Sequence, residues 1–146
     1  MNRRLAIDIG NTRTKFAIFE ERELLHSVSL KNDALELNNE MINEFGVTSI
    51  IMSSVNAEAE SQLQLVNIHK KKLMLHYTTP LPFVIEYESP ETLGKDRIAA
   101  VAGAFARFPQ NNVLVIDAGT CITYDFLTAQ GKYLGGAISP GVQLRL

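Results

Sequence analysis

The sequence predicts an α/β domain in which strands alternate with helices, and two observations support this prediction. Short apolar runs with a two-residue period are separated by longer segments with a helical period, and turn residues stand between them. In addition, one strand–turn–strand unit occurs twice. An Asp-x-Gly turn follows the apolar run at 5–9, and a second one follows the run at 113–117. This repeat predicts two related half-domains, over 1–110 and 111–146, that share one ligand.

The individual elements follow from the same patterns. The first apolar run and the two alternating runs that follow it are joined by polar turns, so they predict an antiparallel meander. Asn32 or Asp33 can cap the first helix, Gly46 ends it, and Pro109 ends the last one. The expected helices cover 33–45, 57–68 and 98–108, and a final Pro-led helix begins within 139–146. The expected strands cover 5–9, 15–19, 24–30, 47–52, 73–77, 83–87, 113–117, 122–126 and 133–138.

Composition narrows the class of protein. The chain has 146 residues, 46% of them hydrophobic and 21% charged, which is ordinary for a globular domain. A net charge of -2 argues against a nucleic-acid surface. No apolar run is long enough to span a bilayer, and Asp8 interrupts the first run too early for a secretory signal. The single cysteine, Cys121, fits a reducing cytoplasm, so we expect a cytoplasmic protein without membrane or nucleic-acid partners.

The first Asp-x-Gly turn has the chemistry of a phosphate site. Asp8 interrupts a buried run, and a buried carboxylate needs a cation or strong donors. Gly10 permits close backbone approach, and Lys15 adds a positive charge after a turn of short polar side chains. An ordinary hairpin with a polar turn explains this stretch equally well on its own. The second copy, with Asp117, favours two carboxylates around one metal-bound polyphosphate.

The polar loop at 94–97 leads directly into an Ala-rich helix. Asp96 stands where a helix N-cap is expected, and spacing alone favours that role. A carboxylate at such a junction can also accept a proton from a substrate hydroxyl. Arg97 beside it can bind a substrate carboxylate through two parallel hydrogen bonds.

With these segments in hand, the chain resembles the type III pantothenate kinases. The resemblance covers essentially the whole chain, and the Gly-x-Asp-Arg segment makes it specific. It implies the ribonuclease H-like fold of actin-like ATPases, with a mixed sheet, flanking helices and duplicated half-domains, the second of them incomplete. The segments that carry it are Asp8-Ile9-Gly10-Asn11-Thr12, Gly94-Lys95-Asp96-Arg97, Asp117-Ala118-Gly119-Thr120 and Gly135-Gly136-Ala137-Ile138-Ser139-Pro140-Gly141.

The resemblance implies ATP-dependent phosphorylation of pantothenate to 4'-phosphopantothenate, the first step of coenzyme A biosynthesis, by a homodimer. Asp96 would be the general base, Asp117 would bind K⁺ or NH₄⁺, and Asp8 would also lie near Mg²⁺. The pantothenate site would comprise Tyr87, Gly94, Lys95, Asp96 and Arg97. The ATP site would comprise Asp8, Ile9, Gly10, Asn11, Thr12, Arg13, Thr14, Lys15 and Thr120.

The chain departs from the family in length, since family members continue well beyond Leu146. We therefore expect a truncated chain with an exposed apolar face and an open sheet edge. One alternative is a non-catalytic binding or regulatory protein, similar to a transcription accessory factor on the same fold. Another is a different phosphotransferase or phosphohydrolase. The intact carboxylates Asp8, Asp96 and Asp117 favour the enzyme, and the Gly94–Arg97 segment favours pantothenate as its substrate.

Overall fold

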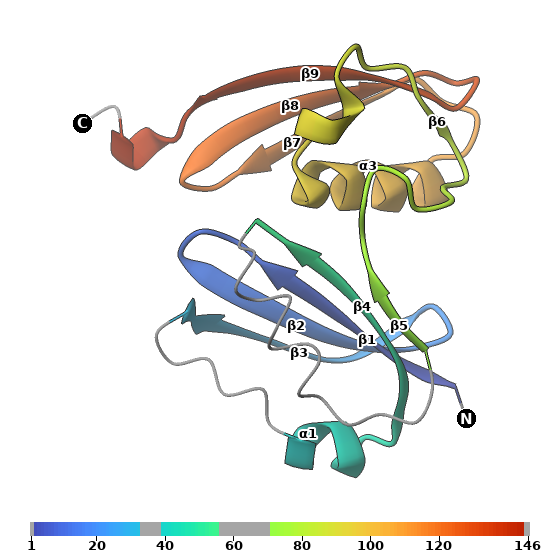
Figure 1. The fold of residues 1–146 in the computed structure, drawn as a ribbon, viewed down its shortest axis with the longest axis vertical. Helices are drawn as coiled ribbons and strands as arrows, with labels where there is room; N and C mark the ends of the chain where they lie inside the picture. The colour runs from blue at the N-terminus through green and yellow to red at the C-terminus, as the bar shows by residue number, and fades with distance from the viewer. Residues whose placement is uncertain (1, 33–38, 56–70, 145–146) are drawn as a thin grey trace. The chain divides into compact units, whose positions relative to one another are not determined.

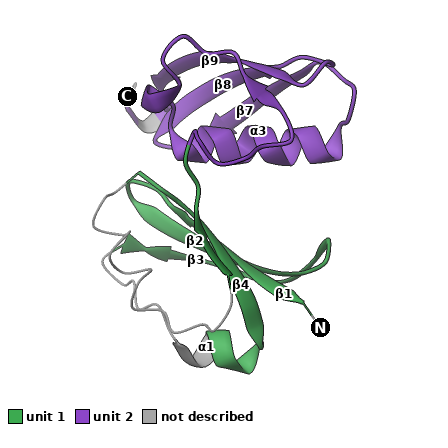
Figure 2. Cartoon of the chain, turned by 45° about the vertical axis from the view of Figure 1, so that its right-hand side comes forward, with its two compact units in different colours: residues 1–76 green, residues 77–146 purple. Residues whose placement is uncertain are grey.

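The computed structural model describes residues 2–32, 39–55 and 71–144. Its contacts divide the chain into two compact units, Met1–His76 and Tyr77–Leu146, which Figure 2 colours green and purple. This division falls before the predicted boundary at residue 110. Two elements that precede residue 110 explain the difference: a short strand at 84–85 belongs to the second sheet, and a helix at 95–107 packs on that sheet. The half-domains at 1–110 and 111–146 are predicted from the internal repeat, whereas these two units are defined by their contacts. The predicted half-domains therefore stay a prediction.

The first unit is built on a five-stranded mixed sheet in the order β3-β2-β1-β4-β5 (Figure 1). β1 pairs antiparallel with β2, and β2 pairs antiparallel with β3, which confirms the expected meander. On its other side β1 pairs parallel with β4, and β4 pairs parallel with β5. The strands are β1 (Arg3–Ile9), β2 (Arg13–Glu20), β3 (Glu23–Lys31), β4 (Val47–Ser54) and β5 (Lys71–Met74).

One face of this sheet carries the apolar core of the first unit. Successive side chains of a strand point to opposite faces, so alternate residues of β1, β2 and β4 reach this core. Asp8 lies between two core residues, Ile7 and Ile9, and therefore points to the opposite face. The buried core residues are Leu5, Ile7, Ile9, Phe16, Ile18, Ile42, Val47, Ile50 and Met52.

The helix α1 (Asn39–Glu44) lies within the predicted segment 33–45. The helix ends at Glu44, and the turn that follows contains the predicted stop, Gly46, whose φ of 60° suits glycine and whose N–H donates to the Asn43 carbonyl at 3.0 Å. Asn32 does not cap this helix, because its side chain bonds the first hairpin instead. Asp33 and the helix predicted at 57–68 lie outside the described residues.

The second unit is built on a four-stranded sheet in the order β6-β9-β8-β7. β7, β8 and β9 form an antiparallel meander, and β6 pairs parallel with β9. The helix α3 contacts β7 and β8 and lies along this sheet in Figure 1. The elements are β6 (Val84–Ile85), η2 (Pro90–Thr92), α3 (Lys95–Arg107), β7 (Val113–Ala118), β8 (Cys121–Leu127), β9 (Lys132–Pro140) and η3 (Val142–Leu144).

Among the predicted elements whose bounds differ from the structure, three show that backbone pairing or helix geometry does not follow side-chain hydropathy. β5 covers Lys71–Met74 rather than 73–77, since both lysines pair with β4. β6 is limited to Val84–Ile85, the part that pairs with β9. α3 begins at Lys95 rather than at 98. The prediction began too late because the residues of the first turn are polar and show no apolar period. The predicted final helix begins as η3 within the described residues, and positions 145–146 of the prediction lie outside them.

The second sheet also exposes several large apolar side chains, as the sequence predicts. Leu114 and Ile116 alternate along β7 and are each 56% exposed, and Phe126 on β8 pairs with Leu114. Leu134 and Ile138 on β9 are exposed as well. Leu114, Ile116 and Phe126 share one face of the sheet, and exposed apolar side chains that gather on one face are unfavourable in water. Within the described ranges, no helix is both long and apolar enough to cross a membrane.

Candidate active site

The first Asp-x-Gly turn joins β1 to β2 through residues 10–12. The Gly10 N–H donates to the Arg13 carbonyl at 3.0 Å, which closes the turn. Asp8 lies opposite Lys15 in the antiparallel register, and its Oδ2 is 3.9 Å from the Lys15 Nζ. The two side chains are 41% and 63% exposed, so this ion pair contributes little stability and both charges can meet a ligand. Ile9, which stands between Asp8 and the turn in the sequence, belongs to the buried core.

Asn32 braces this turn from the end of β3. Its Nδ2 donates to the Gly10 carbonyl, and its Oδ1 accepts from the Thr14 hydroxyl, both at 2.9 Å. Thr14 is fully buried, so its hydroxyl supports the turn rather than facing solvent. The Arg13 guanidinium donates to Ser29 on the neighbouring strand. The exposed side chains of the predicted phosphate-binding stretch are Asn11, Thr12, Arg13 and Lys15.

Ser53, which the sequence analysis missed, lies beside Asp8. The two residues are partners in the parallel pairing of β1 with β4, at the carboxyl ends of both strands. Open α/β sheets bind ligands at such ends. The side chain of Ser53 is 5% exposed, and its Oγ has no hydrogen-bond partner among the described residues. A buried hydroxyl without a partner is unfavourable, so Ser53 offers unused bonding capacity next to Asp8.

The second Asp-x-Gly turn joins β7 to β8 through Gly119 and Thr120. The Gly119 N–H donates to the Cys121 carbonyl at 2.9 Å, which closes this turn as Gly10 closes the first. Asp117 lies opposite Thr123, so its cross-strand neighbour is neutral. Asp117 and Thr120 are both exposed. Each unit therefore contains one antiparallel strand–turn–strand hairpin with an Asp-x-Gly turn, which corresponds to the repeat in the sequence.

The start of α3 holds the predicted catalytic carboxylate. Gly94 is the N-cap, with φ -57° and ψ 131°, and Asp96 belongs to the first helical turn. The predicted N-cap role of Asp96 is therefore wrong. Its Oδ1 accepts from the Arg97 backbone N–H at 2.9 Å, while its Oδ2 makes no hydrogen bond within the described part of the chain. A Cβ at position 94 would overlap the Asp96 Oδ1, so glycine is needed for this placement.

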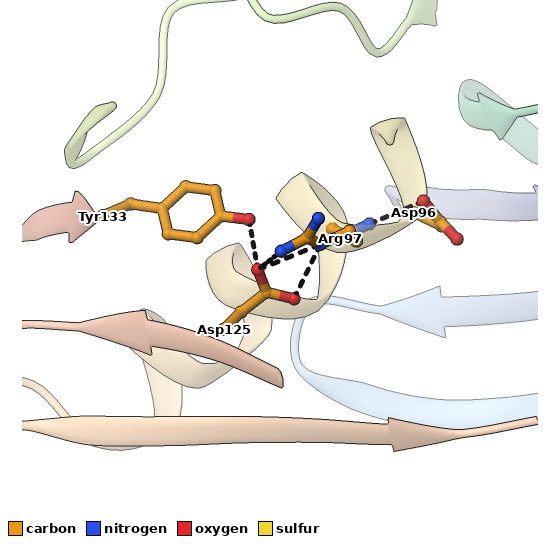
Figure 3. Close-up of polar contacts among 4 residues, drawn as sticks. All are labelled: Asp96, Arg97, Asp125 and Tyr133. Carbon is orange, nitrogen blue, oxygen red and sulfur yellow. Dashed lines mark hydrogen bonds and ion pairs between the residues drawn. The ribbon is translucent and has the colours of Figure 1, made fainter. Parts of the chain in front are cut away.

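Arg97 turns inward and joins a buried polar cluster, shown in Figure 3. Its Nε lies 3.0 Å from both carboxylate oxygens of Asp125, and its Nη2 also donates to Oδ1. The Tyr133 hydroxyl donates to the same Oδ1 at 2.6 Å. The three residues are 7%, 1% and 0% exposed. The bidentate pairing satisfies both charges, as a buried ion pair requires.

Burial and charge shift two ionisations in this cluster. Hydrogen bonding to the Asp125 carboxylate raises the pKa of Arg97 despite the opposing effect of burial. Burial, and then hydrogen bonding to Asp125, raise the pKa of Tyr133 well above its usual range. Both residues therefore keep their protons at neutral pH, so Tyr133 stays a donor and Arg97 stays a cation.

Tyr87 lies next to this cluster. It interacts electrostatically with both Arg97 and Tyr133. Its ring packs directly on Gly135 of β9, because a Cβ at that position would overlap the ring. Gly135 has a φ of 83°, a conformation that favours glycine. The second unit thus brings Tyr87 close to Arg97, the other side chain of the predicted acceptor site.

The described carboxylates fit a metal that arrives with its substrate. Among the described residues, no group of three or more His, Cys, Asp or Glu side chains gathers to form a protein cage. Mg²⁺ in phosphotransferases commonly uses one or two carboxylates together with phosphate oxygens and water. Asp8 suits that arrangement, because Lys15 beside it can meet the phosphate while the carboxylate meets the metal. Asp117 lies opposite a neutral residue, so no lysine balances its charge and it suits a cation alone.

Sequence analysis found most of these residues but missed Asp125, Tyr133 and Ser53. Asp125 stands in an otherwise apolar strand, between Tyr124 and Phe126, which is the same signal that identified Asp8. That signal could have found Asp125 if every carboxylate within an apolar run had been considered. Tyr133 carried no comparable signal.

Two mixed sheets with flanking helices and two Asp-x-Gly hairpins define an α/β protein, in agreement with the ribonuclease H-like fold that the resemblance implies. Among solved structures, the chain is similar to a Ppx/GppA phosphatase of Aquifex aeolicus, with a TM-score of 0.56 and 17% sequence identity. The match covers 99% of this chain and 54% of that one.

The type III pantothenate kinase family model matches residues 4–146, and the chain belongs to that family. Type III pantothenate kinases of Bacteroides fragilis and Christiangramia forsetii are 45% and 48% identical to it. Each match covers 97% of this chain and 59% of the relative, so the chain spans somewhat more than half the length of these relatives.

Proposed function

We propose that this chain carries the phosphate-binding and acceptor-binding parts of a type III pantothenate kinase, which transfers a phosphoryl group from ATP to the primary hydroxyl of pantothenate. Family membership supports the reaction class, and the curated relatives named above are all pantothenate kinases. The single observation that carries the assignment is the start of α3. There, Asp96 keeps Oδ2 available, while the Arg97 backbone N–H donates to Oδ1 and Gly94 leaves room for that oxygen.

In this proposal Asp96 is the general base. Its Oδ2 accepts the proton of the substrate hydroxyl as the new phosphate ester bond forms, and ADP leaves with the electron pair of the broken bond. The half-buried carboxylate needs no reorganisation, because the Arg97 N–H already holds Oδ1. Tyr87 and the Arg97 side chain form the rest of the acceptor site, together with Gly94 and Lys95.

The first hairpin would bind ATP through backbone N–H groups and through the exposed polar residues around Lys15. Asp8 would face Mg²⁺, which when bound neutralises charge on the transferring phosphate. Asp117 would hold the monovalent cation, K⁺ or NH₄⁺, and Thr120 would contact ATP. We further propose a cytoplasmic homodimer, in accord with family membership and the reducing environment that a single exposed cysteine suits.

The test is pantothenate-dependent ADP release in the presence of Mg²⁺ and K⁺, beside isothermal titration of pantothenate. Asp96→Asn should reduce the rate by about 100-fold or more while pantothenate still binds. Gly94→Ala should also reduce the rate, because the added Cβ displaces the Asp96 carboxylate. Glu91→Gln in the neighbouring η2 is the matched control and should leave the rate unchanged. Full activity of Asp96→Asn would refute the base assignment, and a folded chain that binds no pantothenate would refute the acceptor site.

A further inference from the structure

The buried cluster of Arg97, Asp125 and Tyr133 joins three separate elements of the second unit. Arg97 comes from the first turn of α3, Asp125 from β8 and Tyr133 from β9. Figure 3 shows the Asp125 carboxylate between the guanidinium and the phenol. Asp125 Oδ1 accepts from Nε, from Nη2 and from the tyrosine hydroxyl, and Oδ2 accepts from Nε. Both oxygens of this buried carboxylate therefore accept from the Arg97 cation, so Asp125 is held in an ion pair rather than exposed to a substrate hydroxyl.

The way in which Asp125 is bound determines which edge of Arg97 is left. A guanidinium offers a side-on edge, formed by Nε and Nη2, and an end-on edge, formed by Nη1 and the outer hydrogen of Nη2. Asp125 takes the side-on edge. Nη1 makes no hydrogen bond to any residue within the described ranges. A substrate carboxylate can thus be bound bidentately only at the end-on edge.

The same cluster is coupled to the start of α3. The Arg97 backbone N–H holds Asp96 Oδ1, and the Arg97 side chain is held by Asp125. Arg97 is therefore tied at both ends, once to the proposed base and once to β8. Tyr133 fixes the rotation of the Asp125 carboxylate, because its hydroxyl occupies the oxygen that also accepts from Nη2.

We propose that Asp125 and Tyr133 are positioning residues, which hold the Arg97 guanidinium so that its end-on edge binds the carboxylate of the acceptor substrate. This inference rests on the proposed function, because it names pantothenate as the acceptor. It assigns substrate specificity to the cluster: an analogue that lacks the carboxylate loses the contact with Arg97. A purely structural cluster would instead affect all ligands alike.

The test compares the dissociation constants of pantothenate and of pantothenol, in which an alcohol replaces the carboxylate. Wild-type chain should prefer pantothenate by about 10-fold or more, because a bidentate charge-assisted pair is lost with pantothenol. Asp125→Asn should bring this ratio close to one, and Tyr133→Phe should lower it by about 2- to 5-fold. Arg107→Gln, an exposed arginine in the last turn of the same helix, is the control and should keep the wild-type ratio.

An unchanged or increased ratio in Asp125→Asn overturns the proposal, as does an equal loss of affinity for both ligands. If Asp125→Asn does not fold, the Tyr133→Phe ratio decides in the same way. Hydrogen exchange of the Arg97 Nε–H, followed by NMR, separates this inference from the proposed function. Wild type that binds neither ligand refutes the acceptor site. In that case, exchange of the Arg97 Nε–H that is at least 10-fold faster in Asp125→Asn than in wild type still supports the positioning of Arg97 by Asp125. An unchanged exchange rate overturns that positioning.

Discussion

The two Asp-x-Gly hairpins share a local structure but differ in charge. In both, the glycine N–H donates across the turn to a carbonyl, at 3.0 Å in the first and 2.9 Å in the second. In the first hairpin the aspartate faces Lys15 across the strands, and in the second it faces Thr123. The first turn is also longer, with residues 10–12 between the strands rather than 119–120.

This difference shows how one repeated motif can serve two ligands. A carboxylate next to an amine can bind a metal and the phosphate it carries, because both charges find a partner. A carboxylate opposite a neutral residue keeps its full negative charge for a cation. The cross-strand residue, rather than the Asp-x-Gly motif itself, therefore separates the proposed phosphate site from the proposed monovalent-cation site.

The largest expected effect comes from removing the first carboxylate. Asp8→Asn should weaken Mg²⁺-ATP binding by about 10- to 100-fold, which corresponds to the loss of one charge-assisted contact. Isothermal titration with and without Mg²⁺ measures it, and the loss should be smaller for metal-free ATP. Asp117→Asn provides the comparison and should change Mg²⁺-ATP affinity much less. Equal losses in both variants would show that the hairpins are not specialised.

The next test converts the charge pattern of the first hairpin into that of the second. Lys15→Thr should weaken ATP binding by about 3- to 10-fold, since the amine is partly exposed and its charge is screened by solvent. The effect should shrink at high salt, which titrations at low and high KCl would detect. Lys31→Thr at the exposed end of β3 is the control. An unchanged affinity would remove Lys15 from the phosphate site.

Potassium should distinguish the second hairpin. Replacing choline chloride by KCl at equal ionic strength should raise the midpoint of thermal unfolding by about 3–5 °C in wild type, because a bound ion stabilises the folded state. Asp117→Asn should abolish that shift, whereas Asp8→Asn should retain it. A potassium shift that survives in Asp117→Asn would place the ion elsewhere.

Ser53 should separate stability from binding at the first hairpin. Its buried hydroxyl lacks a partner among the described residues, so Ser53→Ala should raise the free energy of unfolding by about 0.5–1 kcal/mol. If the hydroxyl meets the ligand of Asp8, the same change should weaken Mg²⁺-ATP binding by about 2- to 5-fold. Urea unfolding and titration measure the two effects, with exposed Ser27→Ala as the control. A loss of stability would show that the hydroxyl is satisfied in solution.

The smallest effect concerns the unit that carries the second hairpin, and it is confined to alkaline pH. Tyr133 has a raised pKa in the folded state, so the unfolded chain releases this proton first, near pH 10. Its contribution to stability is therefore complete below about pH 10 and is lost as pH rises further. Urea unfolding at several pH values should show this decline in wild type and a shallower one in Tyr133→Phe. Identical slopes would contradict the burial of this phenol.

Much of the fold could be predicted because strands and turns are local. The alternation around Ile7, the turn at Gly10 and the helix stop at Gly46 each depend on neighbouring residues, and the structure confirms them. Boundaries were less predictable where pairing decides them, as in β5, whose lysines belong to the strand only because β4 lies beside them. The N-cap was predicted at Asp96 because aspartate is a common N-cap residue. The structure places it at Gly94, where the absence of a Cβ leaves room for the Asp96 carboxylate, and residue type alone does not reveal this.

The sequence by itself determined the family, the two Asp-x-Gly turns and the polar residues that precede α3, because these reside in short contiguous segments. Only the tertiary structure decided that Arg97 turns inward to Asp125 and Tyr133, and that Ser53 stands beside Asp8. These contacts join residues that are distant in the chain, and an ion pair depends on where strands and helices pack. A residue's type thus indicates what it can bind, whereas its neighbours across the sheet determine what it does bind.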